Sequence, residues 1–286
     1  MQNVLVIPNY NSGRKQAAKQ IKEFRKFLLA ENLAYKVINI DDIENIKIND
    51  FDTIIAVGGD GTINRILPYI NNQILGIIPC GTANLLAANL GIPDNLKSAI
   101  RIIKQNNIKK IDILEVNSRP GVLRTGIGYD ADIITKTSQK LKNTFGYFSY
   151  FIAGILFALK LKNRQYELII DDCEKLTMNA SCIIVANCAN MYKNIVSISS
   201  DSRNDDALFD VFILKTSNVI LFFIEFINIL MNRRKNSKRA VYFKSNRLKI
   251  SSSGFSYHID GEKCKETETI SFLTGTKSIN VFFNSK

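Results

Sequence analysis

The sequence has few of the side chains from which metal clusters and disulfide frameworks are built. There is one histidine, His258, and none of the five cysteines forms a Cys-x-x-Cys pair. Zinc sites usually draw on closely spaced cysteine and histidine ligands, so we expect no zinc site. An odd number of scattered thiols is typical of free cysteines in a reducing compartment, which predicts a cytoplasmic protein. The cysteines are Cys80, Cys173, Cys182, Cys188 and Cys264.

Apolar runs long enough to cross a membrane are also missing. Residues 145–161 contain Ser149 and Lys160, and the shorter run 219–231 contains Glu225. A spanning helix needs about 20 predominantly apolar residues, so we expect no transmembrane helix. The chain passes from two residues at its N-terminus directly into a strand pattern, so we expect no signal peptide.

Known signatures of nucleic-acid binding are absent: there is no helix-turn-helix, zinc-finger or RNA-recognition pattern. The net charge of +12 nevertheless favours an anionic partner. A basic cluster (residues 233–235, 238 and 239) directly follows the apolar run 219–231. This order suits a helix on an anionic membrane surface, but it equally suits a core helix followed by a solvated loop. We therefore expect no nucleic-acid partner and a peripheral association with the inner face of the membrane.

The pattern of elements changes partway along the chain of 286 residues. Up to about residue 107, apolar strands alternate with helical patterns, which predicts a parallel sheet flanked by helices. Beyond it, many short strands with turn signals, the last at 279–283, predict an antiparallel β-sandwich. We predict an α/β N-terminal domain over residues 1–117 and a β-rich sandwich domain over residues 118–286.

The most informative stretch is Val57-Gly58-Gly59-Asp60-Gly61-Thr62-Ile63-Asn64, between a buried strand and a helix. Glycines let the backbone fold tightly and approach a ligand closely. Asp60 offers a carboxylate to a Mg²⁺ ion bound to phosphate oxygens. A turn that uses glycine for geometry alone would not require an aspartate between the glycines. The stretch therefore predicts a nucleotide phosphate site.

A second turn, Pro79-Cys80-Gly81-Thr82-Ala83-Asn84, also follows a strand and also opens a helix. Ligands of parallel sheets gather at the carboxyl ends of the strands, so we expect the two turns to face each other there. There is no Walker loop and no Gly-x-Gly-x-x-Gly, which disfavours the nucleotide folds that carry those motifs.

Together with Gly91-Ile92-Pro93 and Ile259-Asp260-Gly261-Glu262, these turns resemble the diacylglycerol kinase catalytic domain, in its bacterial soluble lipid kinase form. The resemblance covers nearly the whole chain. NAD kinases share the Gly-Gly-Asp-Gly-Thr turn and a related two-domain fold, whereas the other motifs look like the lipid kinase branch.

The resemblance implies ATP-dependent phosphorylation of a lipid hydroxyl, with diacylglycerol as the default acceptor and Mg²⁺ as the metal. Asp60 would serve the catalytic Mg²⁺, and Glu262 would accept the hydroxyl proton. A structural Mg²⁺ would be held by Asp206 through its carboxylate and by Arg203 and Leu208 through their carbonyls. The ATP phosphates would be lined by Asn9, Asn11, Ser12, Gly13, Gly58, Gly59, Asp60, Gly61, Thr62, Asn64, Arg65, Gly81 and Thr82. The second domain would carry the lipid-acceptor side.

The sequence departs from the family pattern near this site. Arg65 stands where glutamate is usual, Leu85 replaces an aspartate, and Ala207 replaces a glycine in the metal loop. Three readings stay open: a working lipid kinase, a nucleotide- or lipid-binding protein with little or no kinase activity, and an NAD kinase. Asp60→Ala is expected to abolish turnover without harming the fold, since Asp60 fills no core. The oligomeric state is not readable, and a homodimer stays open.

Overall fold

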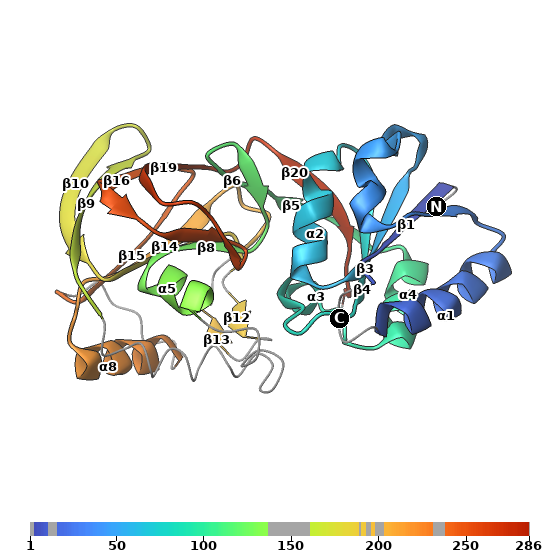
Figure 1. The fold of residues 1–286 in the computed structure, drawn as a ribbon, viewed down its shortest axis with the longest axis horizontal. Coiled ribbons are helices and arrows are strands. Elements are labelled where there is room, and N and C mark those ends of the chain that lie inside the picture. Colours follow the sequence, from blue (N-terminus) through green and yellow to red (C-terminus); the bar gives the residue numbers. More distant parts are fainter. Residues whose placement is uncertain are drawn as a thin grey trace. The chain divides into compact units, whose positions relative to one another are not determined.

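The computed structural model describes residues 3–10, 16–136, 161–188, 190–192, 196–197, 203–230 and 238–285. The chain divides into two compact units. Unit 1 comprises residues 1–111 and 278–286, and unit 2 comprises residues 112–277. In Figure 1, unit 1 comprises the blue and cyan elements together with the red strand labelled β20, and unit 2 comprises the elements coloured from green to orange-red.

Unit 1 is built on a six-stranded sheet with the strand order β2-β1-β3-β4-β20-β5. Strand β1 pairs in parallel with β2 and β3, and β4 pairs in parallel with β3 and β20. Helices α1 and α4 lie side by side (Figure 1). The elements are β1 (Asn3–Pro8), α1 (Gln16–Ala30), β2 (Ala34–Val37), β3 (Thr53–Gly58), α2 (Asp60–Ile66), β4 (Ile74–Pro79), α3 (Leu85–Asn89), α4 (Leu96–Gln105), β5 (Ile108–Asp112) and β20 (Ser278–Phe282), with short 3₁₀ helices η2 (Ile40–Asn45), η3 (Ile48–Asp50) and η4 (Leu67–Tyr69).

The central strands of unit 1 are buried along their whole length. Every residue of β3 is buried, and so are the last five residues of β1 and of β4. Strands read as continuous apolar runs when both faces of a parallel sheet are covered. The alternation of strands and helices thus predicted this layer arrangement correctly.

The end of the chain differs from the domain division we predict from the sequence. Strand β20 runs parallel to β4 in the sheet of unit 1, although the sequence assigns residues 118–286 to the sandwich. The division before it falls between residues 111 and 112 rather than at 117. Ile279, Val281 and Phe282 are buried in unit 1. A short apolar strand fits either sheet locally, so its pattern does not indicate which sheet it joins.

Unit 2 contains two six-stranded sheets, ordered β10-β9-β16-β19-β6-β7 and β15-β14-β11-β8-β17-β18. Its strands are β6 (Leu114–Val116), β7 (Arg119–Gly121), β8 (Arg124–Gly128), β9 (Arg164–Ile170), β10 (Glu174–Ala180), β11 (Cys182–Ala186), β12 (Asn190–Tyr192), β13 (Val196–Ser197), β14 (Phe209–Leu214), β15 (Ala240–Ser245), β16 (Arg247–Phe255), β17 (Tyr257–Ile259), β18 (Glu262–Lys263) and β19 (Thr267–Leu273). One apolar cluster joins both sheets and includes Tyr166, Phe209, Phe255 and Phe272. The neighbouring strands of these two sheets are antiparallel, so the predicted sandwich is confirmed.

Two helices, α5 (Tyr129–Lys136) and α8 (Val219–Leu230), pack on the second sheet. Tyr129 and Phe222 meet edge to face with their ring centroids 5.0 Å apart. The sequence also indicates a helical stretch from about residue 138 to residue 162, which lies almost entirely outside the described residues. Within the described part of the chain, no helix is long and apolar enough to span a membrane.

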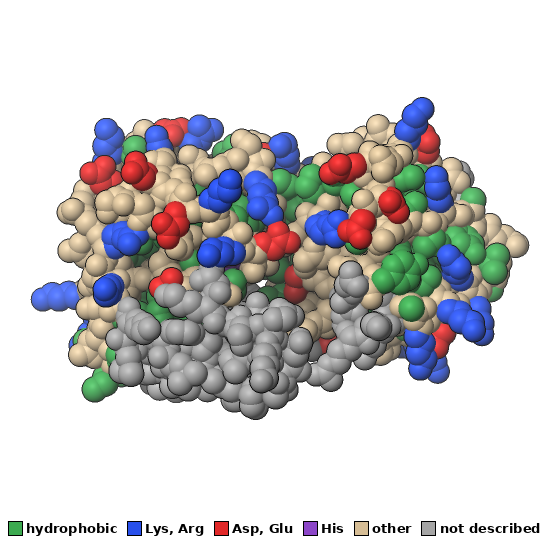
Figure 2. Space-filling view, in the orientation of Figure 1, with side chains coloured by type: hydrophobic (Ala, Val, Ile, Leu, Met, Phe, Trp, Pro, Cys, Tyr) green, Lys and Arg blue, Asp and Glu red, His purple; other side chains and the backbone are tan. Residues whose placement is uncertain are grey.

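The charged side chains show no single concentration on the face drawn in Figure 2. Lysine and arginine are scattered over it and alternate with aspartate and glutamate. The positive net charge is therefore not gathered into one groove on this face.

Candidate functional site

The two glycine turns of unit 1 lie against each other at the carboxyl ends of β3 and β4. Gly58 is paired with Pro79, and the Cys80 N–H donates to the Gly58 carbonyl at 2.8 Å. A Cβ on Gly59 would lie 2.8 Å from the Gly81 Cα, and one on Gly81 would lie 2.5 Å from the Gly59 Cα. Neither position accepts a side chain without a shift of backbone. Glycine is thus required here for a close backbone approach.

The Asp60 carboxylate ties the first turn to the helix that follows the second. Its Oδ2 accepts the Leu85 N–H at 3.0 Å, and its Oδ1 accepts the Leu86 N–H at 3.1 Å. These are amides at the start of α3, which would otherwise lack partners. Burial raises the pKa of the Asp60 carboxyl, and the two N–H groups only partly offset this. Asp60 therefore has a structural task in addition to the metal role predicted for it.

Asn84 shapes the second turn and was not singled out by the sequence. It is buried and adopts a left-handed conformation with φ of 50°. Its Oδ1 accepts the Gly81 N–H at 2.8 Å, and its Nδ2 donates to Asp94 at 2.9 Å. Asparagine tolerates positive φ better than most residues, which is the signal that marks this position.

The side chain of Thr62 lies inside the first turn. Thr62 is buried, and its hydroxyl accepts a hydrogen bond from Asn9 Nδ2 at 3.1 Å. A Cβ on Gly58 would lie 2.1 Å from the Thr62 Oγ1, so glycine is needed there as well. The contact brings the end of β1 to the Gly-Gly-Asp-Gly-Thr turn. Of the other predicted residues after β1, Asn11, Ser12 and Gly13 lie outside the described residues.

Four more of the residues predicted to line the ATP phosphates differ in their exposure to solvent and in their hydrogen-bond partners. Gly61 and Thr82 are exposed. Arg65 is paired with Asp41 at 2.7 Å, so its guanidinium already has a carboxylate partner. The Asn64 Oδ1 is buried and has no hydrogen-bond partner among the residues that the structure describes. A buried orphan acceptor is costly unless a ligand or water supplies a donor.

Glu262, the predicted base, follows a tight hairpin turn in unit 2. Strands β17 and β18 pair Ile259 with Glu262, and the turn residues Asp260 and Gly261 have φ of 49° and 86°. Positive φ at both central positions is the geometry that favours Asp-Gly. The Glu262 carboxylate is partly exposed and forms an ion pair with Arg119 at 2.6 Å. Arg119 lies on β7 and carried no signal in the sequence.

The turn before Glu262 is fastened by its own aspartate. The Asp260 carboxylate accepts three backbone N–H groups, from Val122 at 2.8 Å, Leu123 at 2.9 Å and Arg124 at 2.8 Å. Three such hydrogen bonds satisfy a buried segment of loop and fix the turn against the start of β8. The Asp-Gly pair is therefore both a hairpin turn and an anchor.

The predicted metal loop around Asp206 is occupied by protein groups. Asp206 Oδ2 pairs with the Lys244 ammonium at 2.9 Å, and its Oδ1 accepts the Leu208 N–H at 3.3 Å. Arg203 pairs with Asp205 at 3.0 Å. Ala207 has φ of 57°, the conformation for which glycine is better suited. Within the described residues, no cluster of three or more histidine, cysteine or acidic side chains is placed to bind a metal.

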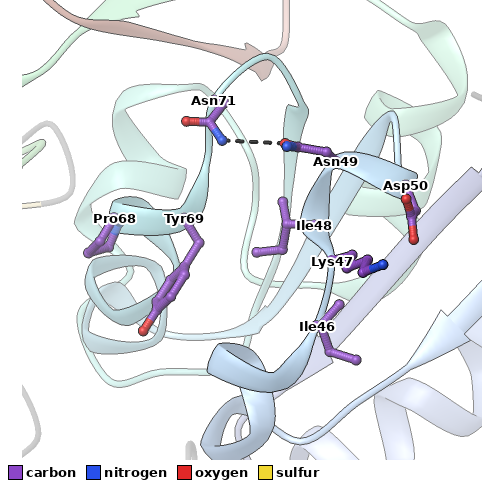
Figure 3. A pocket seen from close by; sticks show the side chains of 8 residues that line it. All are labelled: Ile46, Lys47, Ile48, Asn49, Asp50, Pro68, Tyr69 and Asn71. Atoms are coloured by element: carbon purple, nitrogen blue, oxygen red, sulfur yellow. Dashed lines mark hydrogen bonds between the residues drawn. The ribbon is translucent and has the colours of Figure 1, made fainter.

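An open hollow of unit 1 lies apart from the predicted site residues. Figure 3 shows it between η3 and the segment at η4, with Asn71 donating to Asn49 at 3.4 Å. None of the residues that line it belongs to the turns described above. They are Ile46, Lys47, Ile48, Asn49, Asp50, Pro68, Tyr69 and Asn71.

Comparisons with known proteins agree with both units. Residues 3–116 match the family described as the diacylglycerol kinase catalytic domain. Residues 124–274 match the family described as the YegS C-terminal NAD kinase beta sandwich-like domain. A diacylglycerol kinase of Bacillus subtilis (strain 168) is 30% identical over 277 residues, which cover 92% of this chain and 90% of the relative.

Solved structures show the same fold. A candidate diacylglycerol kinase from Bacillus anthracis str. Sterne has a TM-score of 0.84 at 22% identity, covering 99% of this chain and 97% of the other. An NAD kinase from Archaeoglobus fulgidus, solved in complex with ATP, has a TM-score of 0.59 at 14% identity, covering 100% and 95%. This fold therefore occurs both in a structure described as a diacylglycerol kinase and in one described as an NAD kinase.

Proposed function

Because the chain belongs to the diacylglycerol kinase family, we propose that it transfers the γ-phosphoryl group of ATP to a lipid hydroxyl. Diacylglycerol is the proposed acceptor, and phosphatidic acid would be the product. The relatives that share most of the chain's length carry the name of that activity.

The observation that carries the proposal is the contact of the Gly59 and Gly81 backbones. The two turns at the rim of the parallel sheet approach closely only because Gly59 and Gly81 have no Cβ atom. Such a rim is where ligands of α/β sheets bind. The exposed backbone at Gly61 and the exposed Thr82 would bind phosphate oxygens. The orphan acceptor of Asn64 fits a hydrogen-bond donor of the bound nucleotide or its water shell.

Asp60 fits the role of a Mg²⁺ ligand. Each of its oxygens accepts one backbone N–H, and an ionised carboxylate oxygen has a further lone pair. When bound, Mg²⁺ would neutralise charge on the transferred phosphoryl group. The two amides of α3 would meanwhile hold the carboxylate in a fixed orientation.

Asp206 fits a metal less well. A structural Mg²⁺ at Asp206, with the carbonyls of Arg203 and Leu208, would have to displace the Lys244 ammonium. Lys244 already supplies the positive charge that a cation would bring to this carboxylate. We keep this second metal site as a prediction and assign it no step of the reaction.

Glu262 is the proposed general base. A lipid alcohol is a poor nucleophile unless its proton is accepted during attack, and a carboxylate on a rigid turn suits that task. Arg119 engages Oε2 at 2.6 Å and would orient the carboxylate toward the hydroxyl. An exposed ion pair of this kind contributes only about 0–1 kcal/mol to stability. The ion pair is therefore better explained by the orientation that Arg119 gives to the Glu262 carboxylate than by a contribution to the stability of the fold.

We further propose that the chain acts on lipid at the inner, anionic face of the membrane. On α8, Ile220 is 71% exposed and Ile224 is 42% exposed, one helical turn apart. Phe222 and Val219 pack on the sheet instead. The basic residues 233–235, 238 and 239 follow in sequence, which suits anionic headgroups. Ile220→Ser with Ile224→Ser should reduce sedimentation with vesicles containing phosphatidylglycerol, whereas unchanged binding would rule out α8 as the contact.

The test of the proposed reaction is an acceptor screen with γ-labelled ATP and Mg²⁺. We expect label in phosphatidic acid when diacylglycerol is supplied, and none when NAD is supplied. Sphingoid alcohols, prenyl alcohols and phosphatidylglycerol complete the panel. Label in NADP instead of lipid would contradict the proposal.

A second candidate is a nucleotide- or lipid-binding protein without kinase activity. It is favoured by the engagement of both assigned carboxylates with protein groups and by Leu85 in place of an acidic residue. Binding of ATP and Mg²⁺ without transfer to any acceptor in the panel would support this candidate.

A further inference from the structure

A chain of hydrogen bonds runs inward from the turn that carries Glu262. The Gly261 N–H donates to His258 Nδ1 at 3.2 Å. His258 Nε2 lies 2.7 Å from Asp130 Oδ2, and Arg124 Nη1 donates to the same oxygen at 3.0 Å. A backbone N–H only donates, so Nδ1 must accept and the ring proton must be on Nε2. The contacts on both sides thus select one tautomer of the ring.

The buried surroundings of the His258 imidazole leave room for its contact with Asp130. His258 is completely buried and Asp130 is 8% exposed. His258 is paired with Gly126 of β8, where a Cβ would lie 2.0 Å from Asp130 Oδ2 and 2.5 Å from His258 Nε2. Glycine at 126 therefore makes the contact of histidine with aspartate sterically allowed. A buried carboxylate is costly unless it is paired and hydrogen-bonded, and Arg124 and His258 meet that need.

The charge states of the group agree with this geometry. Burial lowers the pKa of His258, and Asp130 only partly opposes it. Burial by itself would raise the pKa of Asp130, but Arg124 and His258 outweigh it and hold that pKa well below its usual range. At neutral pH the imidazole is neutral and the aspartate is charged. The ring is thus suited to hold a fixed orientation and unsuited to exchange protons with a substrate.

The turn is consequently held from two sides. On one side the Asp260 carboxylate accepts three backbone N–H groups from residues 122–124. On the other, His258 accepts the N–H of Gly261, the residue immediately before Glu262. The Gly261 N–H belongs to the peptide that joins Asp260 to Gly261, so a rotation of this peptide would shift the chain one residue before Glu262.

We propose that His258 is a positioning residue, which orients Glu262 by fixing the Gly261 peptide, while Asp130 and Arg124 fix the imidazole. The effect on catalysis rests on the proposed function, in which Glu262 is the base. The arrangement of the ring and the turn does not depend on it.

The first test reads the ring directly. His258 is the only histidine of the chain, so ¹⁵N-histidine labelling of the full-length protein gives one imidazole signal. We expect the neutral form with the proton on Nε2 at pH 7.5. A proton on Nδ1, or a charged ring at this pH, would overturn the proposal even if kinase activity is found.

The second test uses two variants that each keep one half of the ring's contacts. In His258→Asn the amide oxygen occupies the place of Nδ1 and still accepts from Gly261. In His258→Gln the amide nitrogen reaches the place of Nε2 and still donates to Asp130. We expect hydrogen exchange at the Gly261 amide to rise at least about tenfold more in His258→Gln than in His258→Asn. Equal protection in the two variants would overturn the proposal.

The catalytic consequence follows the same order. Small misplacement of a catalytic group costs up to about 100-fold in rate, so His258→Gln should lose at least about tenfold in kcat, and His258→Asn less. The KM for ATP should change less than twofold in both. A loss confined to the KM for ATP would contradict a role through Glu262. If the wild-type protein transfers no phosphate, the proposed function fails, while the exchange and NMR results still decide the positioning of the turn.

Discussion

Asp60 in unit 1 and Glu262 in unit 2 are both carboxylates on glycine-containing turns, but they are held in different ways. Both residues are partly exposed, but Asp60 accepts two backbone amides of α3, whereas Glu262 meets one arginine side chain. A carboxylate fixed by backbone serves structure as well as chemistry. A carboxylate on the surface of a well-fastened turn is free to serve chemistry alone. The two residues should therefore respond differently to substitution.

Asp60→Ala is expected to have the largest effect. Two amides at the start of α3 would lose their acceptor, which costs about 1–3 kcal/mol of unfolding free energy. The sequence alone predicts no harm to the fold, whereas the two hydrogen bonds of Asp60 predict this loss of stability. Turnover should fall more than about 1,000-fold, in the range of a lost metal and positioning group. The measurements are thermal unfolding and phosphate transfer from labelled ATP.

Asp172→Asn is the matched control, because Asp172 is an exposed carboxylate of unit 2 paired with Arg247, and its positive φ of 59° is one that asparagine also tolerates. Its stability and turnover should stay near those of the wild type. If Asp60→Ala unfolds at the wild-type temperature, the capping role assigned to Asp60 is wrong.

Glu262→Gln should change activity without changing stability. General base catalysis contributes about 100- to 10,000-fold, so kcat should fall by that factor. An exposed ion pair contributes about 0–1 kcal/mol, so the melting temperature should stay nearly unchanged. Glu266→Gln, in an exposed residue nearby, should leave both values unchanged. A loss of ATP binding in Glu262→Gln would show that the residue has another role.

Lys244→Met tests whether the Asp206 carboxylate is neutralised by the Lys244 ammonium or by a metal ion. The pair is mostly shielded from solvent, with side-chain exposures of 26% and 20%. The wild-type melting temperature should be the same in Mg²⁺ and in a chelator, because Lys244 holds the carboxylate. The variant should lose about 1–3 kcal/mol in chelator and regain part of it with Mg²⁺. A wild-type protein destabilised by chelator would show that a metal occupies the loop in spite of Lys244.

The smallest expected effect is a dependence of stability on pH. The pKa of His258 is lowered by folding, so below about pH 6.5 the unfolded chain binds a proton that the folded chain does not. Stability should then fall as the pH decreases, with a slope of up to about 1.4 kcal/mol per pH unit. Asp130, whose pKa is held low in the folded state, adds a further loss below about pH 4.

His258→Gln removes the first of these contributions, and because it keeps a donor to Asp130 it retains the second. Unfolding in denaturant at pH 7, 6, 5 and 4 should show the slope between pH 6.5 and pH 4 decreased in the variant. The same slope in both proteins would contradict a buried neutral imidazole.

Local patterns in the sequence were sufficient for the fold and for the turns of unit 1. Continuous apolar strands, alternating helices and the two glycine turns each follow from neighbouring residues. The rim of the sheet predicted that the two turns face each other, but not that the backbones of Gly59 and Gly81 are in contact. Strand β20 was misassigned because its sheet partner, β4, is far away in sequence.

The partners of the charged side chains were beyond the reach of local patterns. The pairs of Arg119 with Glu262 and of Lys244 with Asp206 join residues 143 and 38 positions apart. Nothing near His258 in the sequence indicates that Asp130 lies against it. Such contacts depend on strand register, which is fixed only when the sheets assemble.

The most direct test of the account is calorimetric binding of ATP with Mg²⁺ to the wild type, Gly81→Ala and Glu262→Gln, each as the full chain. The account predicts similar Kd values for the wild type and Glu262→Gln, and binding at least about tenfold weaker in Gly81→Ala, because a Cβ at Gly81 forces the two turns apart. Equal ATP binding by all three proteins, with Gly81→Ala folded, would contradict the assignment of the nucleotide phosphates to these turns.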